Sequence, residues 1–415
     1  MKNKHQYNGT LRETVFIFGI CVSLLLTACS YIVRPTSEST LLPNVTEHSL
    51  PSASITETPF SLPTPIKESI TQAPIFPAAT VDSQATGQWQ IVTKYGKEVN
   101  QIRALLIDSM GNLWAGGPDF LTQWNTITKE PTVYKLLGNK QINSVTALLE
   151  QNSKIWIGTD GAGIFVKDNT TWTTFGITEG LPNNHISSLV STKDGKVWVD
   201  FSKFEKSVDD IYYFGYIDGK SWNKERGGGF LKITEGADDN IYGAGVSLLP
   251  GADMLATVGR FNQSTSKWEE IYHSTEWITA LARGNDDTLW IAAEDIVYKY
   301  DGKVWTKIIP PWFGQRRKII VSSIAIEPNE TVWFGFSFTW SDMNLPCGLR
   351  SDAAVEYGVY RYTGETWTHF TKEDGLVDNK ICAIVIAPDE SVWFGSYDKG
   401  ISRFDGKTWS SYVVP

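Results

Sequence analysis

The sequence predicts an all-β protein: a seven-bladed β-propeller of four-stranded antiparallel blades, preceded by a signal peptide and a disordered linker. Three observations predict the propeller. A phrase built around one aromatic residue recurs seven times, short segments alternate between apolar and polar residues, and no segment after the first thirty residues has helical periodicity over the length of a helix. The recurring aromatic residues are Trp114, Trp156, Trp198, Tyr242, Trp290, Trp333 and Trp393.

Each repeat is expected to supply four short strands. An alternating segment such as "ITALARG" or "ICAIVIA" precedes each aromatic residue, and a turn rich in Asp, Asn and Gly usually separates the two. A third segment such as "GISRFDG" follows, and a fourth carries its own tryptophan, as in "KTWSSYV". Four strands in about 40 to 60 residues is the period of a propeller blade. Seven such sheets close into a ring without a long exposed edge, so the tryptophans are expected to be structural.

The N-terminus has the features of an export signal. Lys2, Lys4 and Arg12 precede the apolar run "TVFIFGICVSLLLTA", which is shorter than the about 20 residues that a membrane-spanning helix needs. The following "LTACS" resembles a bacterial lipobox, in which the thiol of Cys29 would receive a diacylglycerol. The alternative is a plain signal peptide with a chance cysteine. We expect an exported protein that is lipid-anchored to the outer face of the bacterial cell membrane.

Three regions are expected along the chain. Between Ser30 and Gly87, Ser, Thr and Pro dominate and few residues could fill a core, so this stretch is expected to be a disordered tether. The segment "GQWQIVTKYG" indicates one more strand, which either joins the last sheet and seals the ring or leads into it. The regions are a lipoprotein signal peptide (1–28), the Ser/Thr/Pro-rich disordered tether (29–86) and the propeller (87–415).

The charge of the chain limits its partners. The formal net charge is −9 at pH 7, which argues against nucleic acid and against electrostatic docking to anionic lipid. No second apolar span follows the signal, so we expect contact with the membrane only through the N-terminal lipid anchor.

The most regular repeat, "ICAIVIAPDESVWFGSYDKGISRFDGKTW", together with the connections "EDGLVDNKI" (373–381) and "TEGLPNNHI" (178–186), resembles the propeller repeats of two-component regulators. The resemblance covers about residues 99–415 and is weakest in the third and fourth repeats. It implies an extracytoplasmic, sensor-like propeller that binds ligands, often glycan-derived. No kinase or DNA-binding domain follows in this sequence, so we expect the ring to stand alone on its tether, and no binding residue is carried over from the family.

Two long insertions after the aromatic residue are the first candidate for a ligand site. They occupy 200–216 in the third repeat and 336–357 in the sixth, which lie nearly opposite in a ring of seven. Function in a propeller gathers on such loops because the scaffold holds them rigidly. We expect the insertions to form two lips that bind a glycan fragment, a peptide or an envelope protein, unless their aromatic residues fold back into small cores of their own. The candidate contacts are Phe201, Phe204, Tyr212, Tyr213, Phe338, Trp340 and Arg350.

A second set of candidates lies in the other loops of the same face. Asn184 and His185 end a connection between repeats and are expected to face the ligand. Carboxylates that could surround a hard cation are better explained as solvated turn residues, because they lie several blades apart; they are Asp119, Asp160, Glu294, Asp295 and Asp398. We expect no metal, no cofactor and no catalytic residue.

Two cysteines remain beyond the signal and the lipobox. Cys382 occupies a first strand, at a place where other repeats carry Thr or Ser, and Cys347 lies in the insertion of the sixth repeat. In an exported protein they either form a disulfide that ties the insertion to the last blade or stay buried as reduced thiols.

We therefore expect a membrane-anchored, extracytoplasmic ligand- or protein-binding propeller that is sensor-like and non-catalytic. One alternative is a propeller lyase or hydrolase with metal-assisted acid–base chemistry at the channel mouth, where only His185 and His273 could serve. Another is a structural partner in an envelope complex, which would carry an apolar patch on the outer wall of the ring.

Overall fold

The computed structural model describes residues 101–124, 131–137, 140–201, 212–219, 221–246, 256–314, 320–337 and 358–412. The chain divides into two compact units, Met1–Ala79 and Thr80–Pro415, and all of these residues belong to the second. The predicted signal peptide with Cys29, the tether and the segment 87–96 lie outside the described residues. Over the described ranges, no helix is long and apolar enough to cross a bilayer.

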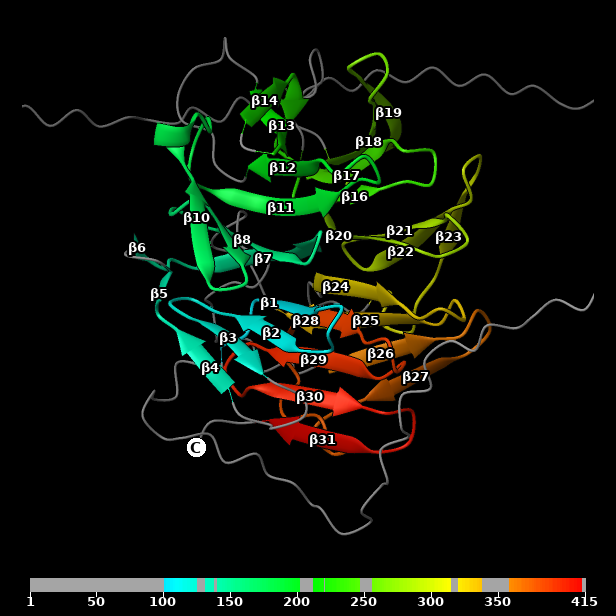
Figure 1. Ribbon diagram of the computed structural model, residues 1–415. Coiled ribbons are helices and arrows are strands. Elements are labelled where there is room, and N and C mark those ends of the chain that lie inside the picture. Colours follow the sequence, from blue (N-terminus) through cyan, green and yellow to red (C-terminus); the bar gives the residue numbers. More distant parts are fainter. Residues whose placement is uncertain are drawn as a thin grey trace, which may run out of the picture. The chain divides into compact units, whose positions relative to one another are not determined.

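Seven antiparallel sheets follow one another along the chain, each in the order of its strands, which confirms the predicted seven-bladed propeller (Figure 1). Blades 1 to 3 comprise β1(Ala104–Ile107), β2(Leu113–Gly116), β3(Leu121–Trp124) and β4(Pro131–Tyr134); β7(Val145–Gln151), β8(Lys154–Thr159), β9(Ile164–Asp168) and β10(Thr171–Phe175); and β11(Ile186–Ser191), β12(Val197–Phe201), β13(Tyr212–Asp218) and β14(Ser221–Glu225). Blades 4 and 5 comprise β16(Lys232–Glu235), β17(Ile241–Val246), β18(Ala256–Asn262) and β19(Lys267–Ser274); and β20(Ile278–Arg283), β21(Leu289–Ala293), β22(Ile296–Tyr300) and β23(Trp305–Ile308).

Blades 6 and 7 comprise β24(Ile320–Ile326), β25(Val332–Ser337), β26(Val359–Tyr362) and β27(Trp367–Phe370); and β28(Ile381–Ile386), β29(Val392–Ser396), β30(Ile401–Phe404) and β31(Trp409–Tyr412). Three short elements lie between blades: the hairpin of β5(Leu136–Leu137) and β6(Lys140–Gln141), the 3₁₀ turn η2(Ile177–Glu179), and β15(Gly227–Gly228), which pairs parallel with β13.

The first strand of each blade lies at the inside of the ring. These inner strands contact one another in sequence, from β1 to β7, β11, β16, β20, β24 and β28, and β28 contacts β1. At this closure the backbone N–H of Ile102 donates to the carbonyl of Ser396 at 2.9 Å. In the described part of the chain all four strands of the seventh sheet come from the C-terminal region.

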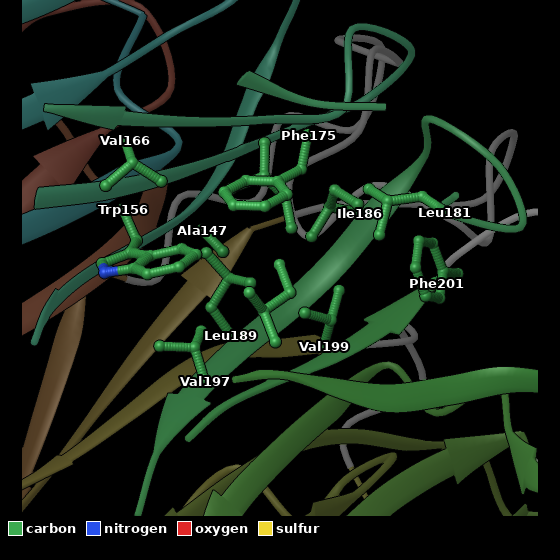
Figure 2. Close-up of a cluster of buried hydrophobic side chains, with 12 residues drawn as sticks. Ala147, Trp156, Val166, Phe175, Leu181, Ile186, Leu189, Val197, Val199 and Phe201 are labelled. Atoms are coloured by element: carbon green, nitrogen blue, oxygen red, sulfur yellow. The ribbon is translucent and has the colours of Figure 1, made fainter. Parts of the chain in front are cut away.

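Apolar side chains fill all seven junctions between neighbouring blades. Figure 2 shows the junction of blades 2 and 3, where Trp156 and Phe175 of one sheet pack with Leu189 and Val199 of the other. Burial of apolar surface stabilises a fold by roughly 25 cal/mol per Å². Because each sheet has an apolar layer on both faces, no blade can bury its surface without both neighbours.

The tryptophans of the second strands are structural, as predicted. All six are buried, and three indole N–H groups donate to the residue that directly follows the first strand of the same blade. The indole of Trp114 donates to Asp108 at 2.9 Å, and the indole of Trp333 donates to Glu327 at 2.5 Å. The third such pair is Trp198 with Thr192, at 3.3 Å.

In four blades glycine stands two residues after the conserved aromatic residue, because the next blade approaches closely there. A Cβ atom on Gly395 would lie 2.4 Å from the side chain of Ile102, and one on Gly116 would lie 2.3 Å from that of Val145. The same contact recurs between Gly335 and Ile381 at 2.8 Å. The glycine of the repeated phrase therefore allows neighbouring blades to pack closely.

Candidate functional site

The loops between second and third strands lie at the same end of the ring as the connections between blades. In blade 2 the N–H of Asp160 donates to the carbonyl of Ser144 at 2.8 Å, just before the inner strand. In blade 5 the backbone N–H of Glu294 donates to the carbonyl of Trp277 at 2.9 Å. In blade 7 the backbone N–H of Tyr397 donates to the carbonyl of Lys380, also at 2.9 Å. These bonds hold both sets of loops together around the mouth of the channel, so this end is called the rim below.

A histidine and a carboxylate meet on the rim between blades 2 and 3. His185 Nδ1 lies 2.5 Å from Asp160 Oδ1, and the two side chains are 23% and 13% exposed. His185 also forms a β-bridge with Asp160, and its N–H donates to Asn183 at 2.7 Å. The pair is thus held in place by the backbone and partly accessible to solvent, and a histidine in hydrogen-bond contact with a carboxylate can act as an acid–base or ligand-binding group.

Arg103 brings a positive charge to the same part of the rim. Its guanidinium donates to the hydroxyl of Ser144, and the residue is 9% exposed. Burial lowers the pKa of Arg103, while the groups of Tyr397, Asp160 and Asp119 act in the opposite direction. Blades 7, 1 and 2 therefore contribute to one polar cluster around a buried cation.

Two carboxyl groups of blade 7 share the rim next to that cluster. Asp378 is 5% exposed, and burial together with the neighbouring Asp398 raises its pKa to about 6. One Asp378 oxygen accepts the N–H of Asn379 at 2.8 Å. Over the described ranges no three His, Cys, Asp or Glu side chains gather in a way that could hold a metal ion.

Blade 5 carries an aromatic and acidic surface on the rim, here called the blade 5 patch: Glu276, Trp277, Glu294, Asp295 and Phe313. Trp277 and Phe313 are each 45% exposed, unlike the tryptophans of the blade junctions. Asp295 accepts the N–H of Gly314 at 2.9 Å, which holds the Phe313 segment beside the acidic loop. Burial raises the pKa of Glu276, and the charges of Glu294 and Asp295 raise it further.

Blade 3 has a buried carboxylate where four other blades have glycine. Asp200 accepts N–H groups from Gly229 at 2.7 Å, Phe201 at 2.8 Å and Phe230 at 2.9 Å. Gly227, Gly228 and Gly229 all have positive φ, at 97°, 98° and 80°, so this stretch requires glycine. The first two glycines form β15, and the N–H of the third donates to the buried carboxyl group of Asp200. Burial raises the pKa of Asp200 to about 7, against the effect of its three hydrogen bonds.

Only part of the two predicted lips lies among the described residues. Phe338, Trp340, Arg350 and Phe204 lie outside the described residues, as does Cys347. Tyr212 and Tyr213 lie in β13, where their backbone pairs with β15.

The expectation for Phe201 was wrong. Its side chain is 0% exposed and packs edge-on against Trp222 in the junction of blades 2 and 3. The reason is its position at the end of β12, where the alternation of the strand directs it into the core rather than into the insertion.

The second set of candidates has mixed outcomes. His185 lies on the rim as expected. Asn184 has a structural role, because its side chain accepts the N–H of Ile177 at 3.1 Å and its carbonyl accepts those of Gly161 and Gly163. Asp160 and Asp398 are not simply solvated, since Asp160 pairs with His185 and Asp398 interacts with Asp378.

Cys382 is buried and disulfide-bonded; its pairing with Cys347 stays a prediction.

Sequence reasoning missed Arg103, Trp277 and Phe313. Arg103 appears as one charged residue before an alternating strand, and Trp277 resembles the structural tryptophans of the repeats. One signal was available for Trp277: it precedes a first strand, where no other repeat has an aromatic residue.

No protein-family model and no curated protein matches the chain. Solved structures do share its fold. The extracellular domain of a hybrid two-component system from B. thetaiotaomicron matches with a TM-score of 0.53 and 16% identity, over 74% of this chain and 38% of that chain. Virginiamycin B lyase from Staphylococcus aureus matches with a TM-score of 0.54 and 13% identity, over 74% of this chain and 95% of that chain. PorZ, a surface component of the type-IX secretion system of Porphyromonas gingivalis, matches with a TM-score of 0.55 and 13% identity, over 74% of this chain and 46% of that chain.

The chain spans less than half the length of the two-component domain and of PorZ. At these identities the likeness concerns the fold. The chain is thus a seven-bladed β-propeller similar in architecture to the extracellular domain of a two-component system, as its repeats indicated.

Proposed function

We propose that this protein is an extracytoplasmic, non-catalytic binding propeller that holds an oligosaccharide on the blade 5 patch. The exposed indole of Trp277 beside carboxylates is the observation that carries the proposal. A flat aromatic face packs well against the C–H face of a pyranose ring, and ionised carboxylates accept strong hydrogen bonds from sugar hydroxyls. Phe313, with the Lys307 ammonium 5.6 Å from its ring centroid, extends the same surface.

Several features support an extracytoplasmic place for this propeller. The first thirty residues have the charge and apolar pattern of an export signal, with Cys29 in a lipobox-like context. Proteins of similar fold include extracellular domains and a bacterial surface component. A lipid on Cys29 would keep the ring at the membrane surface, where it meets saccharides before they enter the cell.

The Trp277→Ala variant is expected to weaken saccharide binding at least tenfold, or about 1.4 kcal/mol, because it removes the stacking surface. The full-length protein is screened by calorimetry against hexasaccharides of glucose, xylose and galacturonic acid. Met110→Ala is the matched control, because Met110 is an exposed apolar side chain in the turn between β1 and β2. Equal affinity of Trp277→Ala and wild type, or no binding of any saccharide, would contradict the proposal.

The Cys29→Ala variant is expected to lose membrane anchorage, because no other thiol stands in the lipobox-like sequence. Wild-type protein should partition into the detergent phase and incorporate labelled palmitate, whereas the variant should stay in the aqueous phase without label. Cys21→Ser changes the other cysteine of the predicted signal and should behave as wild type. A labelled Cys29→Ala variant would rule out the anchor.

A second candidate function is a lyase or hydrolase, favoured by the contact of His185 with Asp160 at the channel mouth. A histidine held by a carboxylate is a common general base. His273, the other histidine considered for this role, lies on the outer strand β19 and pairs with Glu270 at 3.9 Å, so it does not join the site. Chromatography of the saccharides after the binding experiment separates the two functions: intact saccharides support binding, and cleaved ones support the enzyme.

A further inference from the structure

Exposed apolar side chains concentrate on blade 5. Among the described residues six large apolar side chains are exposed, and four of them belong to this blade or to the connection that follows it: Trp277, Val304, Ile309 and Phe313. Val304 lies in the turn between β22 and β23, at the end of the blade away from the rim. The rim of blade 5 thus has three exposed apolar side chains, where the rest of the described rim has one, Ile177.

Three segments of blade 5 are held together at this place. The backbone N–H of Glu294 donates to the carbonyl of Trp277 at 2.9 Å, which joins the β21–β22 loop to the segment before β20. Asp295 Oδ2 accepts the N–H of Gly314 at 2.9 Å, which joins the same loop to the connection after β23. The aromatic and acidic side chains of the patch therefore extend from one hydrogen-bonded backbone framework and not from independent loops.

Negative charge dominates the polar part of the blade 5 patch. Burial raises the pKa of Glu276, and the charges of Glu294 and Asp295 raise it further, so the three carboxylates lie within electrostatic reach of one another. Lys307 acts on Glu276 in the opposite direction, and its ammonium lies 5.6 Å from the centroid of the Phe313 ring. One ammonium against three carboxylates leaves the patch with an excess of negative charge.

A neutral saccharide would use the aromatic surface of this patch but only part of its charge. A carboxylate binds an ammonium more strongly than a hydroxyl group, because both partners of the hydrogen bond are then charged. A cation beside an exposed aromatic ring also gains a cation–π contact. A uronic acid would instead bring a like charge to the three carboxylates. The charge of the patch therefore complements a sugar that carries a positive charge.

We propose that the saccharide held by the blade 5 patch is a cationic amino sugar, an oligosaccharide of glucosamine whose ammonium groups face Glu276 and Glu294. This inference rests on the proposed function, since it names the class of saccharide that the same surface holds. One oxygen of Asp295 is engaged by the N–H of Gly314, so the two glutamates are the principal partners of the ammonium. An N-acetylated sugar has lost the charge and should bind as a neutral sugar does.

The test measures, by calorimetry, the affinity of the full-length protein for hexasaccharides of glucosamine, N-acetylglucosamine, glucose and galacturonic acid. The pH is kept below neutrality, where the amine carries its proton. The glucosamine hexasaccharide is expected to bind about tenfold more tightly than the N-acetylglucosamine and glucose hexasaccharides, because an exposed ion pair and a cation–π contact each contribute modestly. Galacturonic acid should bind most weakly. High salt should remove most of the advantage of glucosamine, because the charges are solvent-exposed.

A double variant and a matched control locate the charge effect. Glu276→Gln combined with Glu294→Gln keeps the shapes of both side chains and should make the affinities for glucosamine and glucose equal. Glu365→Gln removes an exposed carboxylate of the β26–β27 turn and should bind as wild type. This control excludes a general attraction of the cationic ligand to a chain with a net charge of −9. A hexalysine peptide, which has the charge without the sugar rings, should bind more weakly than the glucosamine hexasaccharide.

The outcomes separate this inference from the proposed function. Equal affinity of wild type for glucosamine and glucose, an unchanged preference in the double variant, or tighter binding of hexalysine would overturn the inference. If glucose then still binds and Trp277→Ala weakens its binding, the proposed function stands without it. A glucosamine preference that needs both glutamates but survives Trp277→Ala would overturn the stacking on Trp277 while the charge recognition stands. No binding of any saccharide would overturn both.

Discussion

Replacing Trp333 by alanine is expected to lower the free energy of unfolding by about 3–5 kcal/mol. The indole is fully buried in β25, stacks on Phe370 and contacts Phe394 and Phe404 of the next blade. Its removal leaves a cavity at the junction of blades 6 and 7. It also deprives the buried Glu327 carboxylate of its indole donor. Urea unfolding followed by circular dichroism measures the loss as a lower midpoint.

Trp290 provides the matched comparison for the hydrogen bond. It occupies the corresponding position in blade 5 and is equally buried, but its indole N–H has no partner among the described residues. Phenylalanine at either position keeps most of the ring and removes only the N–H. Trp333→Phe is expected to cost about 1.5–3 kcal/mol more than Trp290→Phe, the contribution of a hydrogen bond to a charged group. Equal costs would show that the bond to Glu327 adds nothing.

Wild type is expected to lose stability as the pH rises from about 4 to 7, and the Asp200→Asn variant is expected not to show this loss. The carboxyl of Asp200 keeps its proton in the folded protein up to a pKa of about 7, whereas the unfolded chain releases it near 3.8. The folded state therefore binds more protons in this interval, and its stability falls as the pH rises through it. The total effect is on the order of 4 kcal/mol, since one pKa unit corresponds to about 1.4 kcal/mol.

Melting curves of wild type and variant at half-unit steps of pH measure this effect as a difference. The amide of asparagine does not titrate, so the two melting temperatures should converge or cross as the pH rises. Asp218→Asn is the control, because Asp218 is an exposed carboxylate of the same blade and should leave the pH dependence unchanged. Parallel curves for wild type and Asp200→Asn would mean that the Asp200 carboxyl does not titrate in this range.

The blades could be predicted because their pattern is local. Alternation within a strand, the aromatic residue of the second strand and the turn before it all lie within about twenty residues, and each repeat shows them again. The tryptophans were predicted to be structural, and Trp114, Trp198 and Trp333 are buried with their indoles bonded to the residue that directly follows the first strand of the same blade.

The candidate sites could not be predicted in the same way. Phe201 looked like part of an exposed insertion, yet the strand continues through it and buries its side chain. Trp277 resembled the tryptophans that pack between sheets. It lies just before the inner strand β20, however, and its side chain is exposed. Exposure depends on the residue that packs opposite, and that residue belongs to another blade.

From its amino acids alone, the number of blades, the strands within each and the buried aromatic layers of this protein followed, because neighbouring residues encode alternation and turns. The packing of neighbouring blades was needed to pair His185 with Asp160, and ring closure was needed to bring Tyr397 of blade 7 close to Arg103. Those contacts join residues that are distant along the chain, so their geometry depends on how the sheets pack and not on any local pattern.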